Sequence, residues 1–226
     1  MTTISNVVLV HGAWADGSSW AKVIPLLADK GLVVTAVQLP LTSFDADVAA
    51  VQRAIALADG EVVLVGHSYG GAVIGQAGND TKVVRMVYVD AFAPDAGESA
   101  GALFSQFQSA PLGAELRPDA GGFLKLSHTG AFELFAQDLD ESEKAIIYAT
   151  QGPVNGAALG GTLSEAAWRT RPTFYLIGDE DRAIPRAEQE KMAARMNATI
   201  AHVSSSHVPM LSQPAAVADI ILKAAG

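Results

Sequence analysis

The chain has 226 residues, of which 50% are hydrophobic and 17% are charged, and its formal net charge is −9 at pH 7. This length and composition fit one large domain and exclude a predominantly disordered chain. The negative charge disfavours nucleic acid and anionic membranes as partners, and the absence of cysteine excludes disulfides, thiolate catalysis and cysteine metal sites.

The N-terminal segment gives no sign of export. The sequence "MTTISNVVLVHGAW" has no basic region, and its apolar run is too short for a signal peptide. No stretch reaches the roughly 20 apolar residues needed to span a membrane. We therefore expect a cytoplasmic protein with no membrane partner, and among assemblies we consider a homodimer.

Six short runs rich in β-branched residues predict the strands of one sheet. Several are almost continuously apolar, which is typical of strands buried on both faces of a parallel sheet. The runs are residues 6–10, 32–37, 61–65, 83–89, 173–177 and 198–203. Segments with helical patterning lie between and after them, at 19–31, 44–60, 187–197 and 214–226. This alternation predicts the α/β class, with a mostly parallel sheet of about six strands and helices on both faces.

The alternation is interrupted between residues 93 and 168. This segment has no β-branched run and is rich in Ala, Gly, Phe and Leu, which indicates a few short helices. We expect a helical cap inserted into a core of residues 1–92 and 169–226. Such a cap would roof the cleft beyond the carboxyl ends of the strands, where ligands usually bind. The alternative is a set of helices that only packs on the sheet.

A sharp strand-to-helix turn, a nucleophile elbow, is predicted at Ser68. Gly66-His67-Ser68-Tyr69-Gly70 matches the pattern G-x-S-x-G, follows a predicted buried strand and precedes a helical stretch. The glycines leave room for a strained turn that exposes the hydroxyl at a helix N-terminus, where negative charge is favoured. We therefore predict that Ser68 is a nucleophile.

A serine nucleophile needs a base to take its proton, and the sequence has five histidines. His207 is the preferred one, because it lies in the loop "SSSHVPMLSQP" after the last predicted strand, from where it can reach Ser68. His67, beside the serine, is expected to be structural. The remaining three are His11 at the end of the first strand, His128 in the insert and His202 within the last strand.

The base in turn needs a carboxylate that fixes its tautomer and stabilises the imidazolium. The loop after the fifth predicted strand, "GDEDRAIP", offers Asp179, Glu180 and Asp181, and spacing alone does not choose between Asp179 and Asp181. An ion pair of one of these acids with Arg182 is the structural alternative. Asp90 and Asp95, after the preceding strand, are weaker candidates.

Stabilising an oxyanion needs two backbone N–H groups that point at the developing charge. One is expected from Tyr69, directly after the nucleophile, and the other from the loop "HGAW" after the first strand. Trp14 in this loop is expected to line the substrate pocket or to pack in the core. Met210 has the same two alternatives, the substrate pocket or the core. Trp14 and Met210 are therefore both candidates for substrate binding.

Five segments resemble the α/β-hydrolases over nearly the whole chain: "VVLVHGAWADGSSW", "VGHSYGGAVI", "VYVDAFAPDAGES", "IGDEDRAIP" and "SSHVPMLSQP". More narrowly, the chain resembles the branch of plant methylesterases and hydroxynitrile lyases with their bacterial esterase relatives. The resemblance implies an α/β-hydrolase fold with the order Ser, Asp, His along the chain. It selects Asp181 through the family's G-x-x-D loop and supports His207 through its H-x-x-x-L-S-x-P segment. It also implies Ala13 as the second N–H donor.

These features predict a serine esterase that cleaves small, fairly apolar carboxylic esters through an acyl-enzyme, with no metal and no cofactor. One alternative is cyanohydrin cleavage. The similar lyases carry threonine and lysine where this chain has Gly12 and Val208, so no cation is available to stabilise departing cyanide. Another alternative is a non-catalytic small-ligand-binding protein on the same fold.

Overall fold

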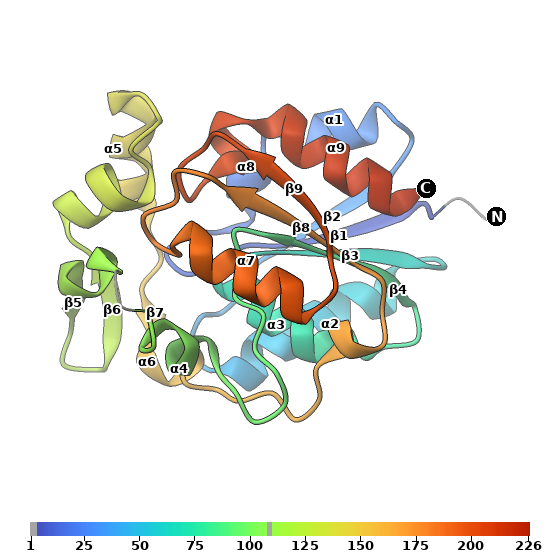
Figure 1. Cartoon of the computed structure of the whole chain (residues 1–226), viewed down its shortest axis with the longest axis horizontal. Helices are drawn as coiled ribbons and strands as arrows, with labels where there is room; N and C mark the ends of the chain where they lie inside the picture. Colours follow the sequence, from blue (N-terminus) through green and yellow to red (C-terminus); the bar gives the residue numbers. More distant parts are fainter. Residues whose placement is uncertain (1–3, 108–109) are drawn as a thin grey trace.

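The computed structural model describes residues 4–107 and 110–226 (Figure 1). Its central sheet has six strands in the order β2-β1-β3-β4-β8-β9, and every neighbouring pair is parallel. The strands are β1 (Asn6–Val10), β2 (Val33–Val37), β3 (Val62–His67), β4 (Val83–Val89), β8 (Thr173–Gly178) and β9 (Thr199–Val203). The α/β prediction is confirmed, and each predicted run matches one strand to within two residues at either end.

The burial of each strand follows its place in the sheet. The inner strands β1 and β3 are buried along their whole length, which explains their continuous apolar sequence. The edge strands β2 and β9 keep several residues exposed. Helices α1 (Ile24–Ala28) and α9 (Pro214–Ala225) cover one face of the sheet, and α2 (Phe44–Leu57) and α3 (Tyr69–Ala77) cover the other (Figure 1).

The helix predicted at 19–31 is broken in two. A 3₁₀ turn, η1 (Gly17–Trp20), precedes the short helix α1, which begins with Pro25 in its first turn. Proline has no N–H to give to the preceding turn, so it starts a helix rather than continuing one. The helices predicted at 44–60, 187–197 and 214–226 correspond to α2, α7 (Arg186–Arg195) and α9. A further one-turn helix, α8 (Pro209–Ser212), was not predicted.

The segment from 93 to 168 contains helices and also a small sheet that the sequence did not predict. The helical elements are α4 (Ala100–Phe104), η2 (Pro111–Glu115), the π-helix η3 (Gly130–Phe135), α5 (Glu141–Thr150), α6 (Gly156–Leu159) and η4 (Ala167–Arg169). Strands β5 (Leu116–Pro118), β6 (Phe123–Leu126) and β7 (Val154–Asn155) form a three-stranded antiparallel sheet. These strands have two to four residues and no β-branched run, so no periodicity could reveal them.

Hydrogen bonds tie this segment to the loops that follow the core strands. The indole of Trp14, after β1, donates to the carbonyl of Leu124 at 2.9 Å. The N–H of Asn155 donates to the carbonyl of Leu41, after β2, at 2.8 Å. The segment therefore lies at the carboxyl ends of the strands, on the left in Figure 1.

Close backbone approaches explain the glycines around Ser68. A Cβ on Gly70 would lie 2.6 Å from the carbonyl oxygen of His11, and one on Gly71 would lie 2.3 Å from that of Phe92. Ser68 itself has φ 52° and ψ −123°, a conformation that non-glycine residues rarely adopt. The prediction of a strained turn with required glycines is confirmed.

Among the described residues, no helix combines the length and apolarity that crossing a bilayer requires.

We expect Gly71→Ala to lower the free energy of unfolding by about 3 kcal/mol, because its methyl group cannot be accommodated beside a backbone oxygen. Gly160→Ala is the matched control, since a Cβ there meets nothing closer than 3.6 Å, and we expect a change within about 0.5 kcal/mol. Urea unfolding measures both variants. Equal stability of the two would contradict the steric explanation.

Candidate active site

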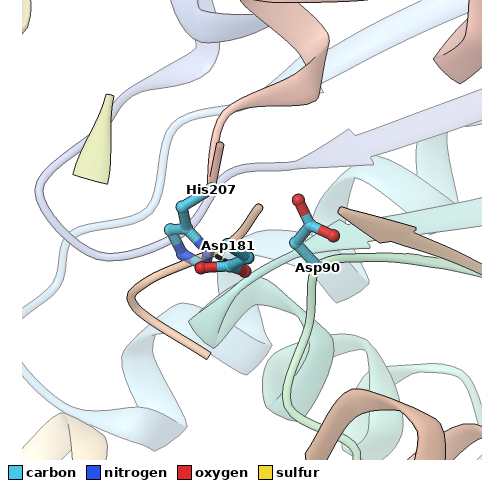
Figure 2. A group of neighbouring side chains, drawn as sticks. All are labelled: Asp90, Asp181 and His207. Atoms are coloured by element: carbon cyan, nitrogen blue, oxygen red, sulfur yellow. Dashed lines mark hydrogen bonds and ion pairs between the residues drawn. The ribbon is translucent and has the colours of Figure 1, made fainter. Parts of the chain in front are cut away.

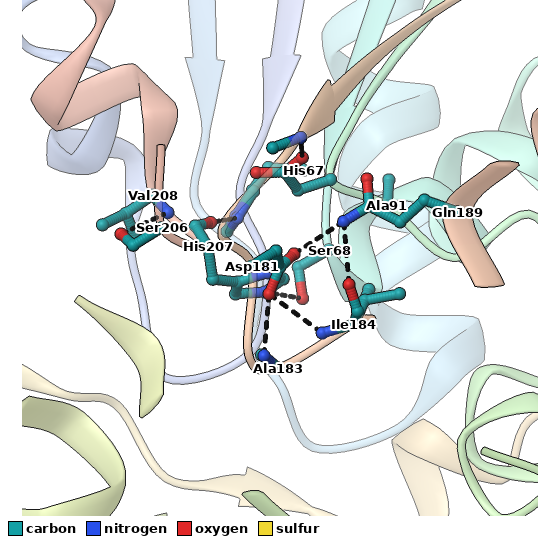
Figure 3. A network of polar contacts seen from close by, with 12 residues as sticks. His67, Ser68, Ala91, Asp181, Ala183, Ile184, Gln189, Ser206, His207 and Val208 are labelled. Atoms are coloured by element: carbon teal, nitrogen blue, oxygen red, sulfur yellow. Dashed lines mark hydrogen bonds and ion pairs between the residues drawn. The ribbon is translucent and has the colours of Figure 1, made fainter. Parts of the chain in front are cut away.

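Three polar side chains from distant parts of the chain form one hydrogen-bonded series (Figure 3). Ser68 Oγ lies 2.8 Å from His207 Nε2, and His207 Nδ1 lies 2.7 Å from Asp181 Oδ2. All three residues are buried. They follow β3, β8 and β9, whose carboxyl ends meet at one edge of the parallel sheet.

The series has a defined direction. An ionised carboxylate only accepts hydrogen bonds, so the Nδ1–H of His207 donates to Asp181. Nε2 is then left to accept the hydroxyl proton of Ser68. This is the arrangement in which an imidazole removes a proton from an attacking hydroxyl.

Asp181 is held by four donors. Its Oδ1 accepts the N–H groups of Ala183 at 2.7 Å and Ile184 at 3.0 Å. Its Oδ2 accepts Gln189 Nε2 at 2.8 Å in addition to His207. We did not predict Gln189 as part of the site. The available signal was a glutamine on the helix directly after the acidic loop.

The neighbouring acid, Asp179, is turned away from the series. It is partly exposed, and its Oδ1 pairs with Arg186 at 3.0 Å and with His202 at 2.9 Å. Arg182 pairs with neither acid in the described part of the chain, and its guanidinium donates to the carbonyl of Glu133 at 2.9 Å. The structure therefore brings Asp181, and not Asp179, to His207.

His67 supports the loop that carries His207. Its Nε2–H donates to the backbone carbonyl of His207 at 2.7 Å. Burial lowers the pKa of His67 well below its ordinary value, and the nearby His207 lowers it further. The ring is therefore neutral near pH 7, as a structural residue requires.

His11 and His128 lie outside the series. His11 Nε2 accepts the N–H of Leu39 at 3.0 Å, and burial lowers the pKa of its imidazole. His128 stacks on Phe132 with ring centroids 3.8 Å apart. His11 therefore holds the backbone after β2 by a hydrogen bond, and His128 takes part in ring stacking.

Ala13 and Tyr69, the two predicted N–H donors, both line the cavity beside Ser68. Within the described part of the chain neither N–H donates to another group. The Tyr69 hydroxyl donates to Asp47 Oδ2 at 2.7 Å, which anchors the first turn of α3. Among the described residues, both N–H groups are therefore without a protein acceptor.

The cavity beside Ser68 is small and apolar, with a volume of about 60 Å³. Its walls from the core include Trp14, Phe92 and Ile184. The 93–168 segment supplies the rest: Ala100, Gly101, Phe104, Leu112, Leu116 and Leu159. Met210 does not line this cavity; it is fully buried and borders a separate hollow under α5. Of the two substrate-binding candidates, Trp14 lines the cavity beside Ser68 and Met210 does not.

Asp90 lies beside the Asp181–His207 pair (Figure 2), and one ligand atom of each residue falls within 4.8 Å of the others. Two carboxylates and an imidazole are groups that a metal ion can use. Here His207 Nδ1 and Asp181 Oδ2 already face each other at 2.7 Å. A metal ion would have to replace that bond.

Comparisons with known proteins give one consistent family. A family model described as "Alpha/beta hydrolase family" matches residues 7–220. "Methylesterase 1" of Arabidopsis thaliana is 28% identical, over 97% of this chain and 95% of that protein. "Pyrethroid hydrolase" of Sphingobium wenxiniae is 26% identical, over 97% and 87%. The crystal structure of a pyrethroid hydrolase from Sphingobium faniae JZ-2 aligns with a TM-score of 0.85 and 22% identity, over 99% and 98%.

A fluorophosphonate probe tests whether the Ser68 hydroxyl is activated. We expect wild-type protein to be labelled at Ser68, because His207 accepts its proton as the oxygen attacks phosphorus and fluoride leaves. Ser68→Ala should not be labelled. Ser204→Ala, an exposed serine in the loop before His207, should be labelled at the wild-type rate. Mass spectrometry of the labelled peptide checks this, and unchanged labelling of Ser68→Ala would contradict it.

Proposed function

Because the chain belongs to the alpha/beta hydrolase family, we propose that it is a carboxylic ester hydrolase with Ser68, His207 and Asp181 as its catalytic triad. The main support is the continuous hydrogen-bond series from Ser68 Oγ through His207 to Asp181, with contacts of 2.8 and 2.7 Å. The names of relatives such as "Methylesterase 1" and "Pyrethroid hydrolase" also support hydrolysis of esters.

The reaction proceeds through an acyl-enzyme. Ser68 Oγ attacks the ester carbonyl while His207 Nε2 takes its proton, and the carbonyl oxygen becomes an oxyanion. The N–H groups of Ala13 and Tyr69 stabilise this oxyanion, and each such donor is worth about 3 kcal/mol in the transition state. His207 then gives the proton to the leaving alcohol. Water then attacks the acyl carbonyl while His207 takes its proton. The carboxylic acid leaves, and Ser68 regains its proton from His207.

Asp181 acts by orienting His207 and stabilising its cationic form. The carboxylate accepts from four donors, so it cannot rotate away without losing several hydrogen bonds at once. This rigidity keeps Nε2 directed at Ser68 throughout the reaction.

The cavity favours a small, neutral and apolar acyl or alcohol group. Among the described residues that line it, none is lysine or arginine. A carboxylate on the substrate would therefore lose its hydration without gaining a counter-ion. The lack of a cation also disfavours cyanohydrin cleavage. Gly12 and Val208 stand where the similar lyases carry threonine and lysine, so no cation is available to stabilise departing cyanide.

A panel of p-nitrophenyl and methyl esters tests the activity. We expect sustained turnover of short neutral esters, and we expect Ser68→Ala to lower kcat by on the order of 10⁴-fold or more, because it removes the nucleophile. A stoichiometric burst without further turnover would instead favour a binding protein on this fold. Full activity of Ser68→Ala would refute the mechanism.

Asp181→Asn should lower kcat by on the order of 10³- to 10⁴-fold, because the amide cannot hold the required tautomer of His207. Asp179→Asn is the matched control in the same loop and should stay within about threefold, as expected for a partly exposed surface pair. Steady-state kinetics on one ester compares them. Equal losses, or the reverse order, would show that Asp179 is the acid.

A further inference from the structure

Two buried oxygen atoms next to the triad have no hydrogen-bond partner among the described residues. Asp90, at the end of β4, is fully buried; its Oδ1 accepts the N–H of Gly178 at 2.5 Å, but its Oδ2 accepts nothing. Gln189, on α7, is also fully buried, and its Oε1 accepts nothing. An unpaired polar atom in a dry interior costs about 1–3 kcal/mol. Both oxygens therefore need a donor.

The orientation of the Gln189 amide is fixed by its other contacts. Nε2 donates to Asp181 Oδ2 at 2.8 Å and to the carbonyl of Ile184 at 2.9 Å. Both of these partners are acceptors, so the nitrogen must face them and the oxygen must face the other way. Asp90 and Gln189 both lie against Asp181: Gln189 Nε2 contacts Asp181 Oδ2 at 2.8 Å, and a carboxyl oxygen of Asp90 lies within 4.8 Å of one of Asp181. A single proton on Asp90 Oδ2 would satisfy both unpaired oxygens.

The surroundings of Asp90 disfavour a negative charge. Burial raises the pKa of Asp90 well above its usual range, and the carboxylates of Asp181 and Asp138 raise it further. The Gly178 N–H and the Gln189 side chain act on this pKa in the opposite direction but do not reverse the shift. The remaining titratable neighbours are Tyr175, whose hydroxyl donates to the carbonyl of Ala91, and His207. Within the described chain, no cation pairs with Asp90.

The backbone leaves a fitted space for this carboxyl group. A Cβ on Gly178 would lie 2.7 Å from Asp90 Oδ2, so only glycine admits the carboxyl there. Asp90 has φ 43°, a conformation that aspartate and asparagine tolerate better than other side chains. The position is thus built for a short side chain with a carbonyl-like group.

We propose that Asp90 is a neutral carboxylic acid that donates a hydrogen bond from Oδ2 to Gln189 Oε1 and thereby positions Asp181 through Gln189. The inference rests on the proposed function, since Asp181 matters as the acid of the triad. Asp90 is a positioning residue, because its hydrogen bond to Gln189 reaches His207 only through Gln189 and Asp181. It contributes no second negative charge to the site.

The variant Asp90→Asn distinguishes a neutral carboxyl group at Asp90 from an ionised one. The asparagine amide oxygen can still accept from Gly178, and the amide N–H can donate to Gln189, but asparagine cannot carry a charge. We expect Asp90→Asn to retain kcat within about threefold and to leave the acid limb of the kcat/KM pH profile in place. Asp90→Ala removes the donor, and we expect kcat to fall by about tenfold to a hundredfold with KM within about twofold.

A double-mutant cycle tests the route through Gln189. Gln189→Met keeps the length of the side chain and removes both hydrogen-bonding groups. If Asp90 acts only through Gln189, the double variant Asp90→Ala, Gln189→Met should be no slower than Gln189→Met alone. Fully additive losses would overturn the route. So would an Asp90→Asn variant as slow as Asp181→Asn, which would mean that a charge is required.

Thermal unfolding provides a readout that does not depend on turnover. In the unfolded chain an aspartate loses its proton above about pH 4, whereas a neutral Asp90 keeps it in the folded protein. The unfolded state then binds fewer protons, so wild-type stability falls as the pH rises from there. Asparagine has no proton to lose, so the Tm of Asp90→Asn relative to wild type should increase between pH 4 and pH 8. A Tm difference that shrinks over this range would show that Asp90 is ionised in the folded protein.

These experiments distinguish a failure of the inference about Asp90 from a failure of the proposed function on which it rests. If wild-type protein cleaves no ester, the proposed function fails, while the Tm series still shows whether Asp90 is neutral. If wild type is active and the Tm difference shrinks, the proposed function stands and the inference is refuted. An infrared carbonyl band of a protonated carboxyl, present in wild type and absent from Asp90→Asn, would support the inference independently.

Discussion

The site depends on a backbone contact between the end of β1 and the start of α3. A Cβ on Gly12 would lie 2.7 Å from Ser68 Cβ, and one on Gly70 would lie 2.6 Å from the His11 carbonyl oxygen. No side chain separates these two turns. Ala13, one residue beyond Gly12, therefore lines the same small cavity as Ser68, as close packing of the two turns requires.

The 93–168 segment contributes more than a wall of the cavity. It contacts both loops that carry the partners of Ser68: Asp138 accepts the N–H of Ser206 at 2.9 Å, and Gln137 donates to the carbonyl of Glu180 at 2.7 Å. The ring of Phe135 also packs against the His207 imidazole, with centroids 4.9 Å apart. The segment that would select the substrate thus also buttresses the imidazole and its acid.

The sequence was most informative where a local pattern has one physical cause. Continuous apolar runs predicted all six core strands, and the glycines around Ser68 predicted the crowded turn, because both patterns reflect short-range sterics. The choice between Asp179 and Asp181 could not be made from spacing, because it depends on Arg186 and His202 drawing Asp179 outward. The β5–β6 hairpin, the bond from Gln189 to Asp181 and the burial of Asp90 beside it were also missed. They depend on which polar atoms meet after folding, and no periodicity records that.

The bonds from Gln137 and Asp138 have a consequence for the alignment of His207 and Asp181. Lifting the stretch around residues 130–138 from the core would break the contacts that hold the Ser206–His207 and Glu180–Asp181 loops. Without these contacts the imidazole of His207 would be less firmly directed at Ser68. A substitution that loosens this stretch would therefore disturb the alignment of Ser68, His207 and Asp181 without changing any residue that lines the cavity.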